Sequence, residues 1–122
     1  MTTMKVLKIT CTGMEQLELD NTLSAMQEQV DGYIEVFHFG RKDARGICNE
    51  DGIYIGLPLN PFATLMTDIA LHGTVLIVGI DPDDPFAEDF CDCPEDLLAF
   101  ADEYRSSKEK DRPADAETVT EE

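Results

Sequence analysis

The sequence has no tryptophan, only nine basic residues, and no long apolar run. Its longest mainly apolar stretch, Val75–Ile80, is interrupted by Gly79 and is far shorter than the roughly 20 residues of a membrane-spanning helix. The first residues mix lysines with polar side chains and lack the apolar segment of a secretory signal. We therefore expect a cytoplasmic protein that does not cross a membrane.

Cysteine is also scarce, with four residues in the chain: Cys11, Cys48, Cys91 and Cys93. Without an export signal, this number favours reduced thiols over disulfides. Cys91 and Cys93 are separated by a single residue, whereas the cysteine pairs of structural zinc sites are usually spaced by two to four. The sequence therefore predicts no metal site and no cofactor.

Acidic residues are abundant: 26 Asp and Glu face 9 Lys and Arg, for a formal net charge of −17. Residues 1–80 carry −5 of this charge and residues 81–122 carry −12. Nucleic acids and anionic lipid surfaces attract positive charge. This composition therefore excludes direct binding to nucleic acid and argues against a membrane-surface protein.

The length of 122 residues fits one domain. After Ser106, Val119 is the only larger apolar side chain, so that segment cannot bury enough surface to offset the entropy of ordering it. We predict a single domain at residues 1–105 and a disordered acidic tail at residues 106–122.

Hydrophobic periodicity predicts several strands and helices. The predicted strands are residues 4–10, 17–19, 33–39, a segment around 46–48 that pairs with 53–55 across an Asn49–Gly52 turn, and 73–79. The predicted helices are residues 22–30, 61–69 and 94–105. Asp20 or Asn21 is expected to cap the first helix and Gly32 to end it, while Asn60 is expected to cap the second.

These elements together predict an α+β fold. Its sheet is expected to be mostly antiparallel and strongly curved, with five or six strands packed against two or three helices. No phosphate-binding glycine loop, dinucleotide fingerprint or zinc-protease motif is present. Nothing near the cysteines or histidines marks an activated nucleophile, so we do not expect an enzyme.

Six short blocks carry a family resemblance: residues 4–9, 21–27, 32–36, 48–52, 56–60 and 73–79. In order and spacing they resemble the domain-of-unknown-function 3846 family over residues 4–80. Members are small proteins typical of bacteriophages and integrative mobile elements, and the family as a whole has no established catalytic activity. The resemblance implies a genomic setting, inside a host bacterial cell, more than a mechanism. The acidic segment from Asp81 to Glu122 departs from it.

One candidate binding site combines a basic cluster with aromatic and amide side chains. Its predicted ligand-binding residues are Tyr33, Phe37, Arg41, Lys42, Arg45, Asn49 and Asn60. Such a set could hold a small anionic ligand such as a nucleotide. A solvated polar loop explains the same residues without a ligand.

The functional hypothesis is a non-enzymatic phage or mobile-element protein that antagonises or modulates a host defence system, for instance by sequestering a nucleotide signal. The alternative is an inhibitor that imitates nucleic acid, with carboxylates between Asp81 and Glu103 occupying the basic groove of a host protein. In that alternative Asp83, Asp84, Glu88 and Asp89 form the acidic ridge. The partner is then a small anionic ligand or a host protein, and self-association into a homo-oligomer is left open.

Overall fold

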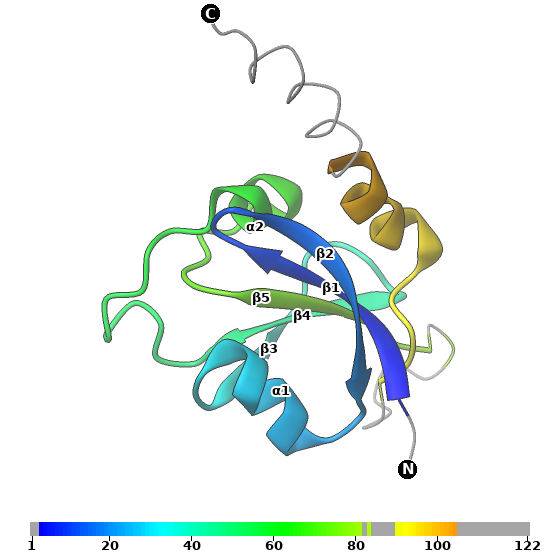
Figure 1. The fold of residues 1–122 in the computed structure, drawn as a ribbon, viewed down its shortest axis with the longest axis horizontal. Helices are drawn as coiled ribbons and strands as arrows, with labels where there is room; N and C mark the ends of the chain where they lie inside the picture. The colour runs from blue at the N-terminus through cyan, green and yellow to red at the C-terminus, as the bar shows by residue number, and fades with distance from the viewer. Residues whose placement is uncertain (1–2, 82, 84–89, 105–122) are drawn as a thin grey trace, which may run out of the picture.

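The structure is a computed structural model that describes residues 3–81, 83 and 90–104 (Figure 1). Its strands are β1 (Thr3–Thr10), β2 (Gly13–Asp20), β3 (Ile34–Phe37), β4 (Ala44–Asn49) and β5 (Val75–Gly79). Its helices are α1 (Leu23–Val30), α2 (Pro61–Thr67) and a helix at residues 95–104. The strands form one open, antiparallel sheet in the order β2-β1-β5-β4-β3. The predicted α+β fold is confirmed.

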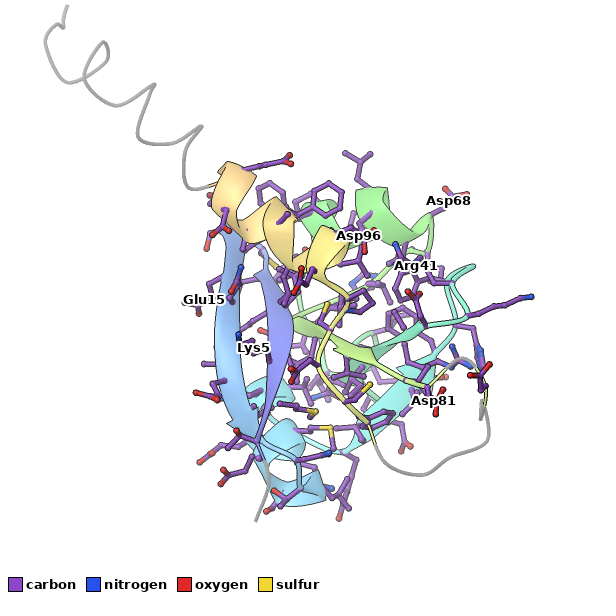
Figure 2. All side chains as sticks on the ribbon, turned by 90° about the vertical axis from the view of Figure 1, so that its right-hand side faces the viewer. Lys5, Glu15, Arg41, Asp68, Asp81 and Asp96 are labelled. Atoms are coloured by element: carbon purple, nitrogen blue, oxygen red, sulfur yellow. The ribbon has the colours of Figure 1, made fainter. Side chains whose placement is uncertain are left out.

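Helices lie on both faces of this sheet. Figures 1 and 2 show α1 on one side, and α2 with the helix at residues 95–104 on the other. Alternation along the central strands supplies both cores, because neighbouring side chains point to opposite faces. Val6 and Leu76 join the core under α1, whereas Leu7 and Ile77 join the core under the other two helices. A central strand buried on both faces accounts for the continuous apolar run of β5.

Residues 91–93 fill a gap between two strands that diverge. β1 and β5 pair directly only where Leu7–Ile9 face Val75–Ile77. Beyond that point Cys91 exchanges two backbone hydrogen bonds of 2.9 Å with Gly79, and the Cys93 amide donates to the Lys5 carbonyl at 2.7 Å. The Asp92 carboxylate accepts from the Lys5 amide at 2.8 Å. These bonds attach the segment that leads into the last helix to the centre of the sheet.

The ends of α1 differ from those predicted. Thr22 is its N-cap, since the Thr22 hydroxyl accepts the Ala25 amide at 3.2 Å, and the expected caps Asp20 and Asn21 are wrong. The left-handed residue at its other end is Asp31, with φ 62°, and not Gly32. Aspartate tolerates this conformation better than most residues. Glycine at position 32 instead makes room for the Asn49 side chain, because a Cβ there would lie 2.6 Å from the side-chain nitrogen of Asn49.

The predicted hairpin between residues 46–48 and 53–55 is wrong. Residues 50–56 form successive turns, and β4 pairs with β3 and β5 instead. The run Val75–Gly79 is buried at every residue and takes the position beside β4, so residues 53–55 have no strand partner in the described part of the chain. Within these turns the glycine with a positive φ angle is Gly56, where φ is 80°.

Other elements agree with the sequence in kind and differ in length. The second strand is eight residues long because β1 and β2 form a continuous hairpin, from Thr3 opposite Asp20 to Thr10 opposite Gly13. The third strand is shorter than predicted and ends at Phe37, where its pairing with β4 stops. The cap of α2 at Asn60 is confirmed.

The predicted tail at residues 106–122 lies outside the described residues. No helix within the described ranges is long and apolar enough to span a membrane.

Candidate binding site

One half of the sheet is left partly uncovered on the face that carries α2. There α2 packs over β1, and the helix at residues 95–104 reaches the β1–β2 hairpin. Gln16 on β2 donates to the Leu98 carbonyl at 3.2 Å, and the Tyr104 hydroxyl donates to the Thr12 carbonyl at 2.6 Å. Over β3 and β4 this leaves a cavity of about 190 Å³, which we call the hollow.

The hollow draws its walls from three parts of the chain. The sheet provides Glu35, Phe37, Cys48 and Asn49, the β4–α2 connection provides Glu50, Gly52, Ile53 and Tyr54, and the α2–β5 connection provides Ile69, Ala70, Leu71 and His72. Its floor depends on a glycine, because the Phe37 ring lies across Gly46 on the neighbouring strand and leaves no room for a Cβ there. A ring placed over a strand glycine offers a broad apolar surface.

Three consecutive exposed apolar side chains lie at the hollow, and two of them, Ile53 and Tyr54, line it. Ile53, Tyr54 and Ile55 are 68%, 89% and 59% exposed and lie between Gly52 and Gly56, and we call residues 52–56 the apolar loop. Turn hydrogen bonds hold it, from the Ile55 amide to the Asp51 carbonyl and from the Leu57 amide to the Gly52 carbonyl. Neighbouring exposed apolar side chains on a strongly acidic protein are characteristic of an interaction surface.

Apart from His72, the ionisable side chains that line the hollow are acids: Glu35, Glu50, Cys48 and Tyr54. Glu35 and Glu50 are exposed, and neither has an ion-pair partner within the described part of the chain. Burial, and then the charge of Glu35, raises the pKa of the Cys48 thiol to about 11, so this thiol is protonated near neutral pH. The Nδ1 of His72 lies 3.0 Å from the Leu57 carbonyl oxygen, an acceptor, and must therefore carry a proton. The arrangement suits non-covalent binding of an apolar group that bears a positive charge.

Of the seven predicted ligand-binding side chains, Phe37 and Asn49 line the hollow, and the other five do not. Asn49 is nearly buried and makes bonds within the protein: its side-chain nitrogen donates to the carbonyls of Val30 and Asp31 at 3.1 and 3.2 Å, and its oxygen accepts the Asp51 amide at 2.7 Å. It therefore fastens the end of α1 to β4. Tyr33 is exposed beside β3.

The predicted basic cluster does not present three open cations. Arg41 forms ion pairs with Asp43 at 2.9 Å and with Asp96 at 2.7 Å (Figure 2 labels Arg41 and Asp96). Hydrogen bonds from Arg41 lower the pKa of both carboxyl groups, and the bond to Asp43, followed by the bond to Asp96, raises the pKa of Arg41. An anionic ligand would therefore have to displace the Asp43 and Asp96 carboxylates from Arg41.

Arg45 points inward and Lys42 points outward. Arg45 is 7% exposed, and its Nη1 donates to the carbonyls of Arg41 and Ala44 at 3.1 and 2.8 Å. Lys42 is exposed and forms no ion pair within the described residues. Asn60 is fully buried, and its hydrogen bonds also stay within the protein. A ligand-binding role for these side chains stays a prediction.

The predicted acidic ridge is only partly described, since Asp84, Glu88 and Asp89 lie outside the described residues. Two further carboxylates between Asp81 and Glu103 make bonds within the protein: Asp92 accepts the Lys5 backbone amide and Asp96 accepts the Arg41 guanidinium. Within residues 3–81, 83 and 90–104, no group of three or more His, Cys, Asp or Glu side chains is placed to hold a metal ion.

Sequence reasoning missed the apolar loop and the α2–β5 connection, including Tyr54 and Leu71. The signal at the loop was available: three large apolar residues between two glycines form a segment too short to bury itself. Because residues 53–55 were predicted to form a hairpin strand, their exposure was not expected. The position of Leu71 depends on the path of the chain after α2, which no local pattern specifies.

Comparison with known proteins gives one result. A family model described as "Domain of unknown function (DUF3846)" matches residues 4–106. This match continues through the last helix, beyond residue 80, where the sequence resemblance was expected to end. No curated protein and no solved structure matches the chain.

Proposed function

The chain belongs to the domain-of-unknown-function 3846 family, and we propose that it is a non-catalytic protein-interaction domain that binds a partner through the hollow and the apolar loop. The observation that carries the proposal is their adjacency: a cavity on the uncovered half of the sheet opens beside three exposed apolar side chains. Interfaces typically combine one buried anchor with surrounding contacts that exclude water.

The size of the hollow favours a protein partner over a small molecule. Small-molecule sites usually enclose about 300–1,000 Å³. The hollow measures about 190 Å³, which suits one large side chain and leaves little room for a whole nucleotide. An inserted side chain from a partner would use the cavity fully, with the apolar loop packed around it.

Charge also favours a partner segment that is not anionic. Among the described residues, His72 is the one basic side chain that lines the hollow, and Glu35 and Glu50 would repel a phosphate. Arg41 and Arg45, which the nucleotide hypothesis needs, are bonded within the protein. These contacts support protein binding over nucleotide sequestration.

The family resemblance supplies the biological setting of the proposal. Because such proteins are typical of bacteriophages and mobile elements, we place the partner among host proteins in the bacterial cytoplasm. Binding alone would then antagonise or modulate a host function, such as a defence system.

The test compares the wild-type protein with an Ile53→Ser/Tyr54→Ser variant against peptides selected on the wild type from a displayed random-peptide library. We expect the variant to bind the dominant peptides at least a hundredfold more weakly, since two anchor truncations commonly cost more than about 1.4 kcal/mol each. The melting temperature should change little because both side chains are exposed.

The matched control is Leu65→Ser, which removes an 87% exposed apolar side chain on α2 that does not line the hollow. It should leave peptide affinity unchanged. If the library yields no binding peptide, or if its dominant peptides bind the Ile53→Ser/Tyr54→Ser variant as well as the wild type, the proposed function is wrong.

A further inference from the structure

We infer that the partner binds as an extended segment that adds a sixth strand to the outer edge of β3, with a basic side chain beside Glu35 and Glu50. This inference rests on the proposed function and specifies the partner's chemistry and conformation. Adding a strand to an exposed sheet edge is a recurrent mode of peptide recognition, in which backbone hydrogen bonds supply affinity and pockets for alternate side chains supply specificity.

The position of β3 provides the hydrogen-bonding groups. β3 is an edge strand that pairs with β4 on one side, and no strand within the described residues pairs with its other side. Along a strand, backbone N–H and C=O groups point alternately to the two sides. The outer groups of β3 are therefore available to an added strand.

The side chains of β3 connect this edge with the hollow. Glu35 and Phe37 point to the hollow, whereas Ile34 belongs to the core under α1. A residue directly opposite on an adjacent strand has its Cβ about 4.5–5.5 Å away. A residue opposite Phe37 would thus enter the hollow, and a residue opposite Glu35 would meet its carboxylate.

The position of Glu50 strengthens the preference for a basic residue. The Glu50 amide donates to the Tyr33 carbonyl at 2.9 Å, which places Glu50 at the end of β3 nearest Glu35. Both carboxylates lack an ion-pair partner in the described part of the chain. The expected partner sequence carries Arg or Lys opposite Glu35 and an apolar residue opposite Phe37, with a second apolar residue between them facing the half-exposed Val36.

The two edges of the sheet differ in a way that selects β3. The β2 edge carries Glu15, Glu18 and Asp20 along eight residues, and charges of this kind protect edge strands from unwanted pairing. β3 has one charged residue, Glu35, and exposed Tyr33 and Val36 next to it. A second copy of the chain is the less suitable occupant, because two molecules of net charge −17 repel each other.

The experiment uses the tightest peptides from the same random-peptide selection, synthesised with a single backbone N-methyl group at each position in turn. N-methylation removes one N–H donor, so strand addition predicts a tenfold or greater loss of affinity at every second position of the central residues and little change between them. Hydrogen exchange of the outward amides of β3 should slow when the peptide binds.

Charge reversal tests the basic position. Glu35→Lys should weaken binding at least tenfold, and replacing the peptide's basic residue by Glu should restore it. Selected peptides without a basic residue would overturn the basic position, and an N-methylation profile with no period of two would overturn strand addition. If either occurs while Ile53→Ser/Tyr54→Ser still abolishes binding, the proposed function stands and this inference fails. A library that yields no binding peptide contradicts both.

Discussion

Replacing Asn60 by aspartate is expected to lower the free energy of unfolding by roughly 4 kcal/mol. The substitution leaves two buried carbonyl groups without a hydrogen-bond donor, and each such loss costs about 1–3 kcal/mol. Asn60 is fully buried, and its side-chain nitrogen donates to the carbonyls of Ile9 and Gly73 at 2.9 and 2.8 Å. Its oxygen accepts the Ala63 amide at 3.1 Å and so caps α2. Aspartate keeps the cap and turns an oxygen toward both carbonyls.

Chemical denaturation measures this effect, and Thr22→Asp is the matched control. Thr22 caps α1 in the same way, but it is exposed, and its side chain donates to no buried carbonyl of the described residues. The control should change stability by no more than about 0.5 kcal/mol, because Thr and Asp are both good caps. A loss of less than about 1 kcal/mol in Asn60→Asp would mean that Asn60 does not tie β1, α2 and the start of β5 together.

Replacing Gly79 by alanine is expected to cost roughly 2 kcal/mol or more, as overpacking of a well-packed interior commonly does. A Cβ at Gly79 would collide with the backbone carbonyl of Asp92, which cannot move aside as a flexible side chain could. The collision should loosen residues 91–93 from the gap between β1 and β5.

Cys93 reports this loosening. Its thiol is almost fully buried, and burial raises its pKa to about 12, so it should react slowly with iodoacetamide in the native wild type. Gly79→Ala should speed Cys93 alkylation, whereas Glu28→Ala on the exposed side of α1 should not. Unchanged stability and unchanged Cys93 reactivity would show that residues 91–93 are not packed tightly between β1 and β5.

The sequence was most informative where one segment determines its own environment. The glycine-bounded run ending at Gly79 could be assigned to a buried strand because no other position accommodates its side chains. Asn60-Pro61 could be assigned to a helix start because the cap and the first-turn proline are local features. The strand prediction for residues 53–55 was wrong for the opposite reason, because a segment distant in the sequence decides it. β5, and not residues 53–55, pairs with β4.

The candidate site was harder to predict because burial and pairing decide which charges are available. Arg41, Lys42 and Arg45 look alike in the sequence, yet Arg41 is neutralised by Asp96, 55 residues away, and Arg45 turns into the domain. Asn49 lines the hollow, but its side-chain nitrogen is bonded to the end of α1. The apolar loop could have been recognised from its composition, whereas the hollow depends on how far the helices extend over the sheet.

Recognition of a cationic, partly apolar group by the hollow can be measured by an NMR titration of the labelled protein at constant ionic strength. The probes are n-butylguanidinium, which imitates an arginine side chain, and inorganic phosphate. We predict that butylguanidinium shifts the amides of Glu35, Cys48, Tyr54 and Leu71 saturably, that Glu35→Gln reduces these shifts, and that phosphate shifts none of them. Saturable phosphate shifts at residues 41–45, with no response of the hollow to butylguanidinium, would contradict the account and favour the anionic-ligand hypothesis.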